Sequence, residues 1–178
     1  MASTRYLEMS ESEYDQISNR IRASYPNSCI CWIEEVMNPS LRKAYEARRA
    51  LLFSGGAGPN SEQLLFHGTS EEAVNNIAAG GFDPTYNKAS AYGKGTYFAK
   101  NASYSFNYMK SEKNGISFML LCDVLVGNSC LGSSDMRINT SLYDSSVDNL
   151  ANPTIFVTPY ADGAYPKYII AFHKNAPK

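Results

Sequence analysis

The sequence predicts an α+β fold with a largely antiparallel sheet. Segments typical of strands outnumber segments typical of helices, and the helices come early in the chain. A doubly wound parallel sheet requires regular alternation of strands and helices, with a glycine turn directly after the first strand, and the sequence has neither. A chain of 178 residues is long enough to bury one substantial core, so we expect a single domain over residues 1–178.

The N-terminal part, about residues 10–55, is predicted to contain two helices. Residues 10–25 place apolar side chains on one face of the first helix. Ser10 and Glu13 have the spacing of a capping box at its start, and Pro26 ends it. We therefore expect an amphipathic helix that packs on the rest of the domain.

A strand and the second helix complete this part. The segment CICWIEEVMN, residues 29–38, is typical of a strand. Its last residue, Asn38, is a favourable helix cap, and Pro39 suits the first helical position. Gly55 and Gly56 are expected to end the helix that follows.

The sheet core is predicted to extend over about residues 62–174. Its helices are short, one over residues 69–81 and another over residues 102–110. Thr69 and Glu72 have the spacing of a capping box for the first of them. Strands are expected at residues 64–69, 95–99, 116–127, 154–160 and 167–174.

Composition and charge argue against several functional classes. The formal net charge is −1, which gives no bulk electrostatic attraction for nucleic acid. The N-terminus lacks the apolar run of a signal peptide and no stretch has the length of a membrane span, so we expect an intracellular protein, cytoplasmic or nuclear, without a membrane partner. The four cysteines form no C-x-x-C pair and neither histidine lies near a cysteine cluster, so no metal site is expected.

The stretch AYGKGTYFA, residues 91–99, does not fit a phosphate-binding loop. A Walker A loop needs four residues between its first glycine and the Gly-Lys pair, and then a helix. Gly93, Lys94 and Gly95 are too close together, and a strand follows them. By pattern alone this stretch is a tight turn that leads into a strand carrying Tyr97.

Four residues outside this turn have the chemistry needed to bind a flat amide. His67 ends an apolar strand and is followed by Gly68, which would let a planar ligand reach the backbone N–H and C=O. A structural role for a histidine in this position is the alternative. Ser105 and Tyr108 are three residues apart on a short predicted helix, so they share a face. A hydroxyl, an aromatic plane and a backbone amide pair suit a carboxamide that bonds at its edge and stacks on its face.

Several ordered motifs, FHGT, YGKGTYFA, SFNY, NPTIFV and YPKYIIAF, together resemble the catalytic domain of the PARP-like, diphtheria-toxin-type ADP-ribosyltransferases. The resemblance covers about residues 38–172 and is strongest from Phe66 onward. It implies two packed, mostly antiparallel sheets with a cleft for NAD between them and short flanking helices. It also implies a transferase that uses NAD as its substrate and needs no metal.

The resemblance assigns roles to individual residues. His67 would hydrogen-bond a hydroxyl of the adenosine ribose of NAD. Gly68 would hold the nicotinamide carboxamide through its backbone, and Ser105 would add a hydroxyl. Tyr108 would stack on the nicotinamide ring, and Tyr97 would line its other side.

The resemblance also implies further contacts with NAD. Thr69 follows the His-Gly pair and is included among the cofactor-binding residues. Residues 82–93 correspond to the family's donor loop over the cofactor. From that loop Tyr86 or Tyr92 could touch NAD, although a plain surface position is equally compatible with the sequence.

The third signature residue of the polymer-forming members is a glutamate at the start of a late strand, and here that position is Ile155. The triad therefore reads His67, Tyr97, Ile155. Isoleucine accepts no hydrogen bond, and loss of a positioned charge-stabilising group costs roughly 3–4 kcal/mol of transition-state stabilisation. Asp123, inside an apolar strand, is a weak candidate to replace the glutamate because we expect it to face solvent.

Three outcomes stay open from the sequence. The acceptor's own carboxylate could replace the glutamate, which gives transfer of one ADP-ribose to protein acceptors, including the enzyme itself, without polymer. The domain could instead bind NAD without useful turnover, as an interaction module. Transfer to phosphorylated nucleic-acid ends is a third possibility, against which the near-neutral charge argues. Because the other NAD contacts are all present, we favour the first.

Overall fold

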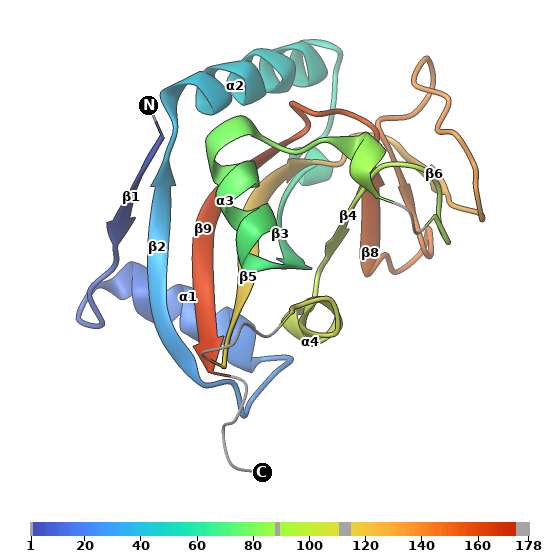
Figure 1. Cartoon of the computed structure of the whole chain (residues 1–178). Coiled ribbons are helices and arrows are strands. Elements are labelled where there is room, and N and C mark those ends of the chain that lie inside the picture. The colour runs from blue at the N-terminus through green and yellow to red at the C-terminus, as the bar shows by residue number, and fades with distance from the viewer. Residues whose placement is uncertain (1, 88–89, 111–114, 174–178) are drawn as a thin grey trace.

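The computed structural model describes residues 2–87, 90–110 and 115–173. Within these residues nine strands form one sheet in the order β1-β2-β9-β5-β3-β4-β8-β7-β6 (Figure 1). Every pair of neighbours is antiparallel except β6 and β7. The expected α+β class and mostly antiparallel pairing are confirmed.

The predicted helices and strands occur in the expected order, and three further strands, β1, β6 and β7, were not predicted. The strands are β1 (Ser3–Tyr6), β2 (Ile30–Met37), β3 (Glu62–Thr69), β4 (Thr96–Ala99), β5 (Ile116–Leu125), β6 (Ser129–Leu131), β7 (Ser145–Val147), β8 (Ile155–Thr158) and β9 (Ala164–His173). The helices are α1 (Ser12–Arg22), α2 (Pro39–Ser54), α3 (Glu71–Gly80) and α4 (Ala102–Phe106), with short 3₁₀ turns at Pro59–Ser61 and Pro84–Tyr86.

Strands β5 and β9 form the centre of the sheet and are buried on both faces. Alternate side chains of β5 point to opposite sides, as the pleat requires. Phe118 and Leu120 pack with the α3 residue Val74 in one apolar cluster. Met119 packs with the α1 residue Ile17 in the other. The sheet thus separates two cores, one under α3 and one under α1 (Figure 1).

The two expected sheets are joined into one at β3 and β4. Strand β3 pairs with β5 along eight residues but with β4 only through Phe66 and Ala99. One registered pair lets β4 and β8 diverge from the rest of the sheet, as Figure 1 shows. The end of β3, His67–Thr69, therefore runs alongside β4 without a registered pair with it.

Both predicted capping boxes are wrong. Helix α1 begins at Ser12, and Glu11 at its cap position makes no side-chain cap bond. The Glu13 carboxylate instead accepts a hydrogen bond from the Tyr168 hydroxyl of β9, so a tertiary contact replaces the local one. Helix α3 is capped one residue later than expected, by Ser70, whose hydroxyl oxygen accepts from the Ala73 N–H at 3.3 Å.

Helix α4 is shorter than its predicted range of residues 102–110. The α-helix ends at Phe106, so Tyr108 lies in the turn that follows. The Tyr108 N–H still donates to the Ser105 carbonyl at 3.0 Å, which keeps the two residues together. Among the described residues, no helix combines the length and apolar character needed to cross a membrane.

Candidate active site

His67 lies near the end of β3, on the face opposite to that of Gly68. Its Nδ1 is 2.8 Å from the Tyr97 carbonyl oxygen, and its ring packs edge-on against Phe82 at 5.4 Å between centroids. A carbonyl only accepts, so Nδ1 carries the proton and Nε2 of the neutral ring presents a lone pair. Burial lowers the pKa of His67, which keeps the ring neutral at physiological pH. The histidine can therefore accept a hydrogen bond from a ligand hydroxyl.

Tyr97 on β4 bonds back to the turn that precedes it. Its hydroxyl donates to the Gly93 carbonyl at 2.7 Å and accepts from the Tyr92 N–H at 2.9 Å. Gly93 has φ of 115°, which favours glycine, and its turn closes onto the ring hydroxyl. A Cβ on Gly95 would lie 2.4 Å from the Thr158 carbonyl oxygen, so this glycine is required by the close approach of β8. The two glycines of AYGKGTYFA thus allow the turn and the approach of β8 that hold the Tyr97 side chain in position.

Ile155 begins β8, beside β4. It pairs with Ala99, and Tyr97 pairs with Val157, so Tyr97 and Ile155 point to the same face of the two strands. Phe98 and Phe156 point to the opposite face, into the core under α3. The register therefore brings the Tyr97 and Ile155 positions together, and the Tyr97 carbonyl links them to His67.

Gly68 packs directly against α4. A Cβ at this position would lie 1.9 Å from the Ser105 carbonyl oxygen, which no side chain tolerates. The glycine is thus required by the approach of the helix, a reason that the sequence alone did not provide. The same contact places the buried Ser105 beside the His-Gly pair.

Tyr104 joins the predicted aromatic residues. Its hydroxyl is 3.0 Å from that of Tyr108, and the two ring centroids are 5.3 Å apart. Burial raises the pKa of Tyr104, and the hydrogen bond with Tyr108 raises it further. Burial also raises the pKa of Tyr97. The hydrogen bond from the Tyr92 N–H lowers this pKa, while the nearby phenols of Tyr92 and Tyr108 raise it. The four tyrosines therefore lie within electrostatic range of one another.

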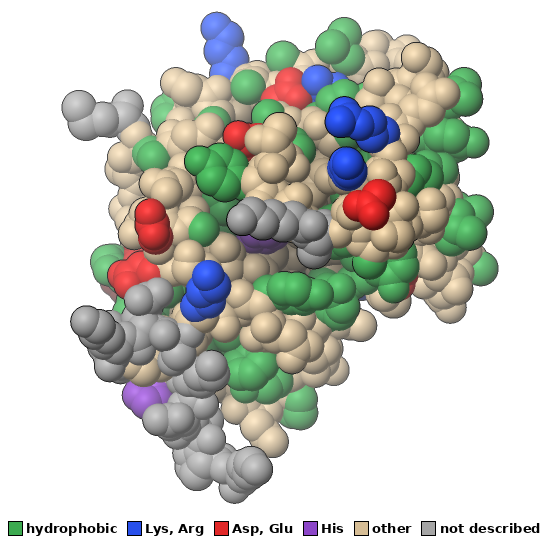
Figure 2. Space-filling view, turned by 45° about the vertical axis from the view of Figure 1, so that its right-hand side comes forward, with side chains coloured by type: hydrophobic (Ala, Val, Ile, Leu, Met, Phe, Trp, Pro, Cys, Tyr) green, Lys and Arg blue, Asp and Glu red, His purple; other side chains and the backbone are tan. Residues whose placement is uncertain are grey.

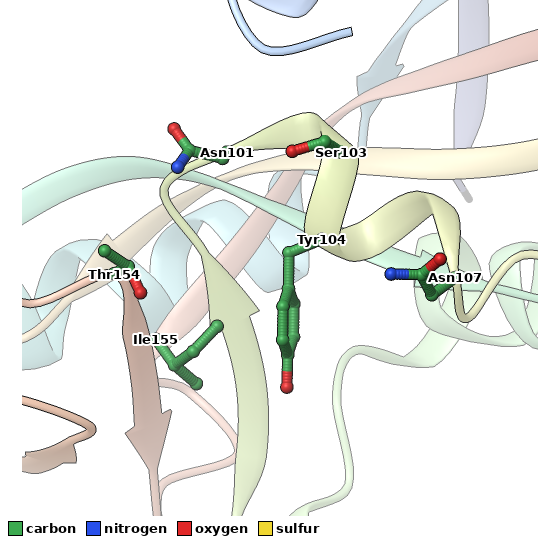
Figure 3. A pocket seen from close by; sticks show the side chains of 6 residues that line it. All are labelled: Asn101, Ser103, Tyr104, Asn107, Thr154 and Ile155. Carbon is green, nitrogen blue, oxygen red and sulfur yellow. The ribbon is translucent and has the colours of Figure 1, made fainter.

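A cavity of about 350 Å³ borders this group of tyrosines. Figure 3 shows its lining in two groups, one on and beside α4 and one at the start of β8. Among the residues that the structure describes, the lining carries amides, hydroxyls, one aromatic ring and one aliphatic side chain but no charged one: Asn101, Ser103, Tyr104, Asn107, Thr154 and Ile155. Sequence reasoning missed this set apart from Ile155, although Tyr104 lies four residues before Tyr108, the spacing of neighbours on a helix.

Asp148 is the carboxylate next to Ile155. Its Oδ1 accepts from the Ile155 N–H at 3.0 Å and the Thr154 N–H at 2.9 Å, and its Oδ2 accepts from the Thr154 hydroxyl at 2.6 Å. Burial works to raise the pKa of Asp148, but these hydrogen bonds outweigh it and lower the pKa. The carboxylate is ionised and occupied in fixing the start of β8, so it does not replace the family's glutamate.

The other residues considered from sequence lie in different settings. Asp123 does not face solvent freely, because it forms an ion pair at 3.2 Å with Arg42 of α2. Thr69 ends β3 opposite Phe118. Tyr86 is 84% exposed and residues 88–89 of the expected donor loop lie outside the described residues. Tyr92 is half-buried, and its carbonyl accepts from the Ser146 hydroxyl at 2.6 Å.

The charges around this region are dispersed. Figure 2 shows, on the face that it draws, both signs of charge, with Lys or Arg side chains close to Asp or Glu side chains at the top and upper right and no large patch of a single sign. In the described part of the chain, no three His, Cys, Asp or Glu side chains group in a way that could hold a metal ion. The candidate site is therefore built from aromatic rings, hydroxyls, backbone amides and one neutral histidine, which together suit an uncharged flat group and sugar hydroxyls.

Known proteins resemble this chain over most of its length. A family model described as "Poly(ADP-ribose) polymerase catalytic domain" matches residues 11–167. The "Protein mono-ADP-ribosyltransferase PARP14" of Homo sapiens is 34% identical over 93% of this chain, and PARP11 of Homo sapiens, with the same descriptive name, is 34% identical over 90%. A probable poly(ADP-ribose) polymerase of Dictyostelium discoideum is 34% identical over 92%. The chain spans only 10%, 56% and 50% of these relatives, respectively.

Proposed function

The chain belongs to the family of poly(ADP-ribose) polymerase catalytic domains, and on that basis we propose that it is a mono-ADP-ribosyltransferase. It would transfer one ADP-ribose from NAD to a protein side chain and release nicotinamide. Its acceptors would include the protein itself. The observation that carries this proposal is Ile155 in place of the family's glutamate, next to an intact His67–Tyr97 pair.

The residues of the site would bind and orient NAD. Nε2 of His67 would accept a hydrogen bond from a ribose hydroxyl, and the Gly68 backbone with the Ser105 hydroxyl would hold the carboxamide. Tyr97 and Tyr108 would flank the nicotinamide ring. Thr69 and Tyr92 are proposed to lie along the bound dinucleotide, and Tyr86 at its outer edge.

Bond cleavage would separate the ribose C1 from the nicotinamide nitrogen. The bonding pair leaves with nicotinamide, which departs as a neutral molecule, and the acceptor oxygen supplies the new pair to C1. Ile155 offers no carboxylate to activate a hydroxyl, and the carboxylate of Asp148 is occupied by Thr154 and Ile155. An acceptor that is already anionic, such as a protein carboxylate, needs no base.

We infer that the acceptor side chain enters through the cavity between α4 and β8. Ile155 and Thr154 form one wall of it and Asn107 another, so it opens next to the position of the missing glutamate. The described residues that line it carry no charge of their own, whereas a glutamate in place of Ile155 would repel an incoming carboxylate. We also infer that the protein acts in the cytoplasm or nucleus, where its four free cysteines would stay reduced.

The test is incubation with NAD labelled in its adenylate part, followed by gel electrophoresis and by measurement of free nicotinamide. We expect discrete labelled bands, including the enzyme itself, together with nicotinamide release. A high-molecular-weight smear contradicts mono-transfer. Binding of NAD without release of nicotinamide over hours identifies a non-catalytic module. Preferential labelling of a 5′-phosphorylated oligonucleotide over protein identifies a nucleic-acid transferase.

A pair of tyrosine variants tests the pocket itself. Tyr108→Ala removes a ring proposed to stack on nicotinamide and should weaken NAD binding by roughly 1–3 kcal/mol. Tyr6→Ala removes a ring that is 63% exposed on β1 and serves as the matched control. Equal NAD affinity in the two variants, measured by calorimetry, would show that the pocket is assigned wrongly.

A further inference from the structure

The segment after β6, residues 132–136, lies against the turn that holds Tyr97. The Asp135 N–H donates to the Ser90 carbonyl at 2.9 Å, and the Ser90 hydroxyl donates to the Asp135 carboxylate. At the other end of the turn, the Lys94 N–H donates to the Met136 carbonyl at 2.8 Å. Residues 90–95 are therefore hydrogen-bonded to this segment at both ends, through Ser90 and through Lys94.

The two backbones approach closely, which requires glycine at position 132 and leaves little room for a Cβ at position 93. A Cβ on Gly132 would lie 2.3 Å from the Tyr92 carbonyl oxygen. A Cβ on Gly93 would lie 3.3 Å from the Met136 carbonyl oxygen. The Ser146 hydroxyl of β7 donates to the same Tyr92 carbonyl at 2.6 Å and adds a third attachment. The turn is thus held from outside as well as by Tyr97.

Asp135 has an unusual backbone conformation. With φ of 59°, it is the non-glycine residue with a positive φ among residues 2–87, 90–110 and 115–173. Such a conformation costs energy for residues with a Cβ, less for Asp and Asn than for others. Residues in these conformations persist where surrounding contacts determine them, and they concentrate at functional sites. Here the contacts with Ser90 determine the conformation.

The attachment of this turn bears directly on the candidate site. Tyr92 and Gly93 supply both hydrogen bonds of the Tyr97 hydroxyl. The Tyr97 carbonyl in turn fixes the tautomer of His67. A continuous series of hydrogen bonds therefore runs from Asp135 through Ser90 and the turn to the two residues proposed to contact NAD.

We propose that Asp135 is a positioning residue of the NAD pocket, which acts by holding residues 90–95 against Tyr97. The proposal rests on the proposed function, since it concerns the same pocket. The carboxylate is available for this role at neutral pH, because the Ser90 hydrogen bond and the nearby Lys94 lower the pKa of Asp135. The Asp135 carboxylate accepts hydrogen bonds from the Ser90 and Ser134 hydroxyls, so its contacts act on the site through the turn.

Three substitutions of Asp135 separate its backbone from its side chain. Asp135→Asn keeps an acceptor for Ser90 and the tolerance for positive φ, so its NAD binding should stay close to that of the wild type. Asp135→Gly keeps the backbone conformation but loses the acceptor, and should raise KM for NAD about three- to fivefold. Asp135→Ala loses both and should raise KM about tenfold, with a smaller effect on kcat in each case.

Ser90→Ala tests the partner of the same hydrogen bond. It should raise KM as much as Asp135→Gly does, and the double variant should add nothing further, because one interaction is removed in both. Ser141→Ala, in an exposed turn after β6, is the matched control. The proposal is overturned if Asp135→Gly and Ser90→Ala both keep the KM of Ser141→Ala, or if the effects of the two variants add fully.

Amide hydrogen exchange without NAD separates this proposal from the proposed function. Asp135→Gly and Ser90→Ala should accelerate exchange at Gly93 and Lys94, whose N–H groups bond to Ser90 and Met136. If exchange is accelerated in these variants but the protein does not bind NAD, Asp135 does hold the turn and the proposed function is rejected. Unchanged exchange together with normal NAD binding would reject Asp135 as a positioning residue and leave the function standing.

Discussion

The hydroxyl of Tyr97 shows how one residue can organise a site by bonding to its own neighbours. Both of its hydrogen bonds go to the backbone of the preceding turn, and its carbonyl holds His67. The sequence predicted that the turn delivers Tyr97 to a pocket, but not that the hydroxyl closes the turn. Side-chain bonds of this kind depend on the exact path of the backbone, which residue patterns do not define.

Tyr97→Phe should therefore destabilise the turn before β4, while the aromatic ring stays in place. The substitution leaves the Gly93 carbonyl and the Tyr92 N–H without their partner, and should destabilise the protein by about 1–2 kcal/mol and raise KM for NAD. Urea unfolding and initial-rate kinetics measure the two effects. Tyr6→Phe, on an exposed edge, is the control. Full stability and unchanged KM in Tyr97→Phe would refute this account of the turn.

His67 predicts a pH dependence whose sign follows from its lowered pKa. The unfolded chain binds a proton near pH 6.5, while the folded state resists protonation because the ring is buried. The stability contributed by the neutral ring is therefore complete above pH 6.5 and is lost as the pH falls through the folded pKa. NAD affinity should stay constant from pH 8 to about 6.5 and fall below it. A His67 NMR titration with a pKa at or above 6.5 would contradict this.

Among the secondary-structure elements, local sequence patterns predicted most helices and strands, but not the contacts between distant segments that replace local capping. Strand β1 was missed because all its side chains are exposed and show no alternation. Strands β6 and β7 were missed because three residues are too few for a period. The first capping box failed because Glu13 bonds to Tyr168 on a distant strand, and the second because Ser70 caps α3 in place of Thr69. The packing of α4 on Gly68 could not be predicted either, because the periodicity of a sequence does not define the path of the loops between elements.

Gly68→Ala tests the packing of α4 on β3. The added methyl group would collide with the Ser105 carbonyl, so α4 must shift, and we expect a loss of about 1–3 kcal/mol in the free energy of unfolding. Gly80→Ala, where a Cβ meets nothing within 4 Å, is the matched control and should not destabilise. Chemical denaturation of both variants gives the comparison. Equal stability would mean that the contact is soft enough to absorb a methyl group.

For the whole molecule, the family motifs predicted which strands meet at the site, but not the cavity and the residues that surround it. The motifs around His67, Tyr97 and Ile155 come from three strands, and the sheet register does bring their positions together. The cavity, Asp148 and Asp135 were not predicted, because they arise where segments distant in sequence meet. Patterns identify the residues of each strand, whereas cavities depend on how the strands and α4 pack.

Ile155→Glu should not convert the protein into a polymerase. Chain growth also requires a surface that binds the ADP-ribose to be extended, and a glutamate here would lie next to the ionised Asp148. Ile155→Gln, similar in shape and uncharged, is the control. Product length on a high-percentage gel measures the outcome. Long polymers formed by Ile155→Glu and not by Ile155→Gln would show that the one residue limits the reaction.

Mono-ADP-ribosylation by this protein is tested by mass spectrometry of peptides from the protein and an acceptor mixture after incubation with NAD. We expect modified peptides that each carry a single ADP-ribose per modified side chain, and less modification at subsaturating NAD in Tyr108→Ala but not in Tyr6→Ala. Side chains that carry two or more linked ADP-ribose units would contradict it. So would a protein that binds NAD and yields no modified peptide.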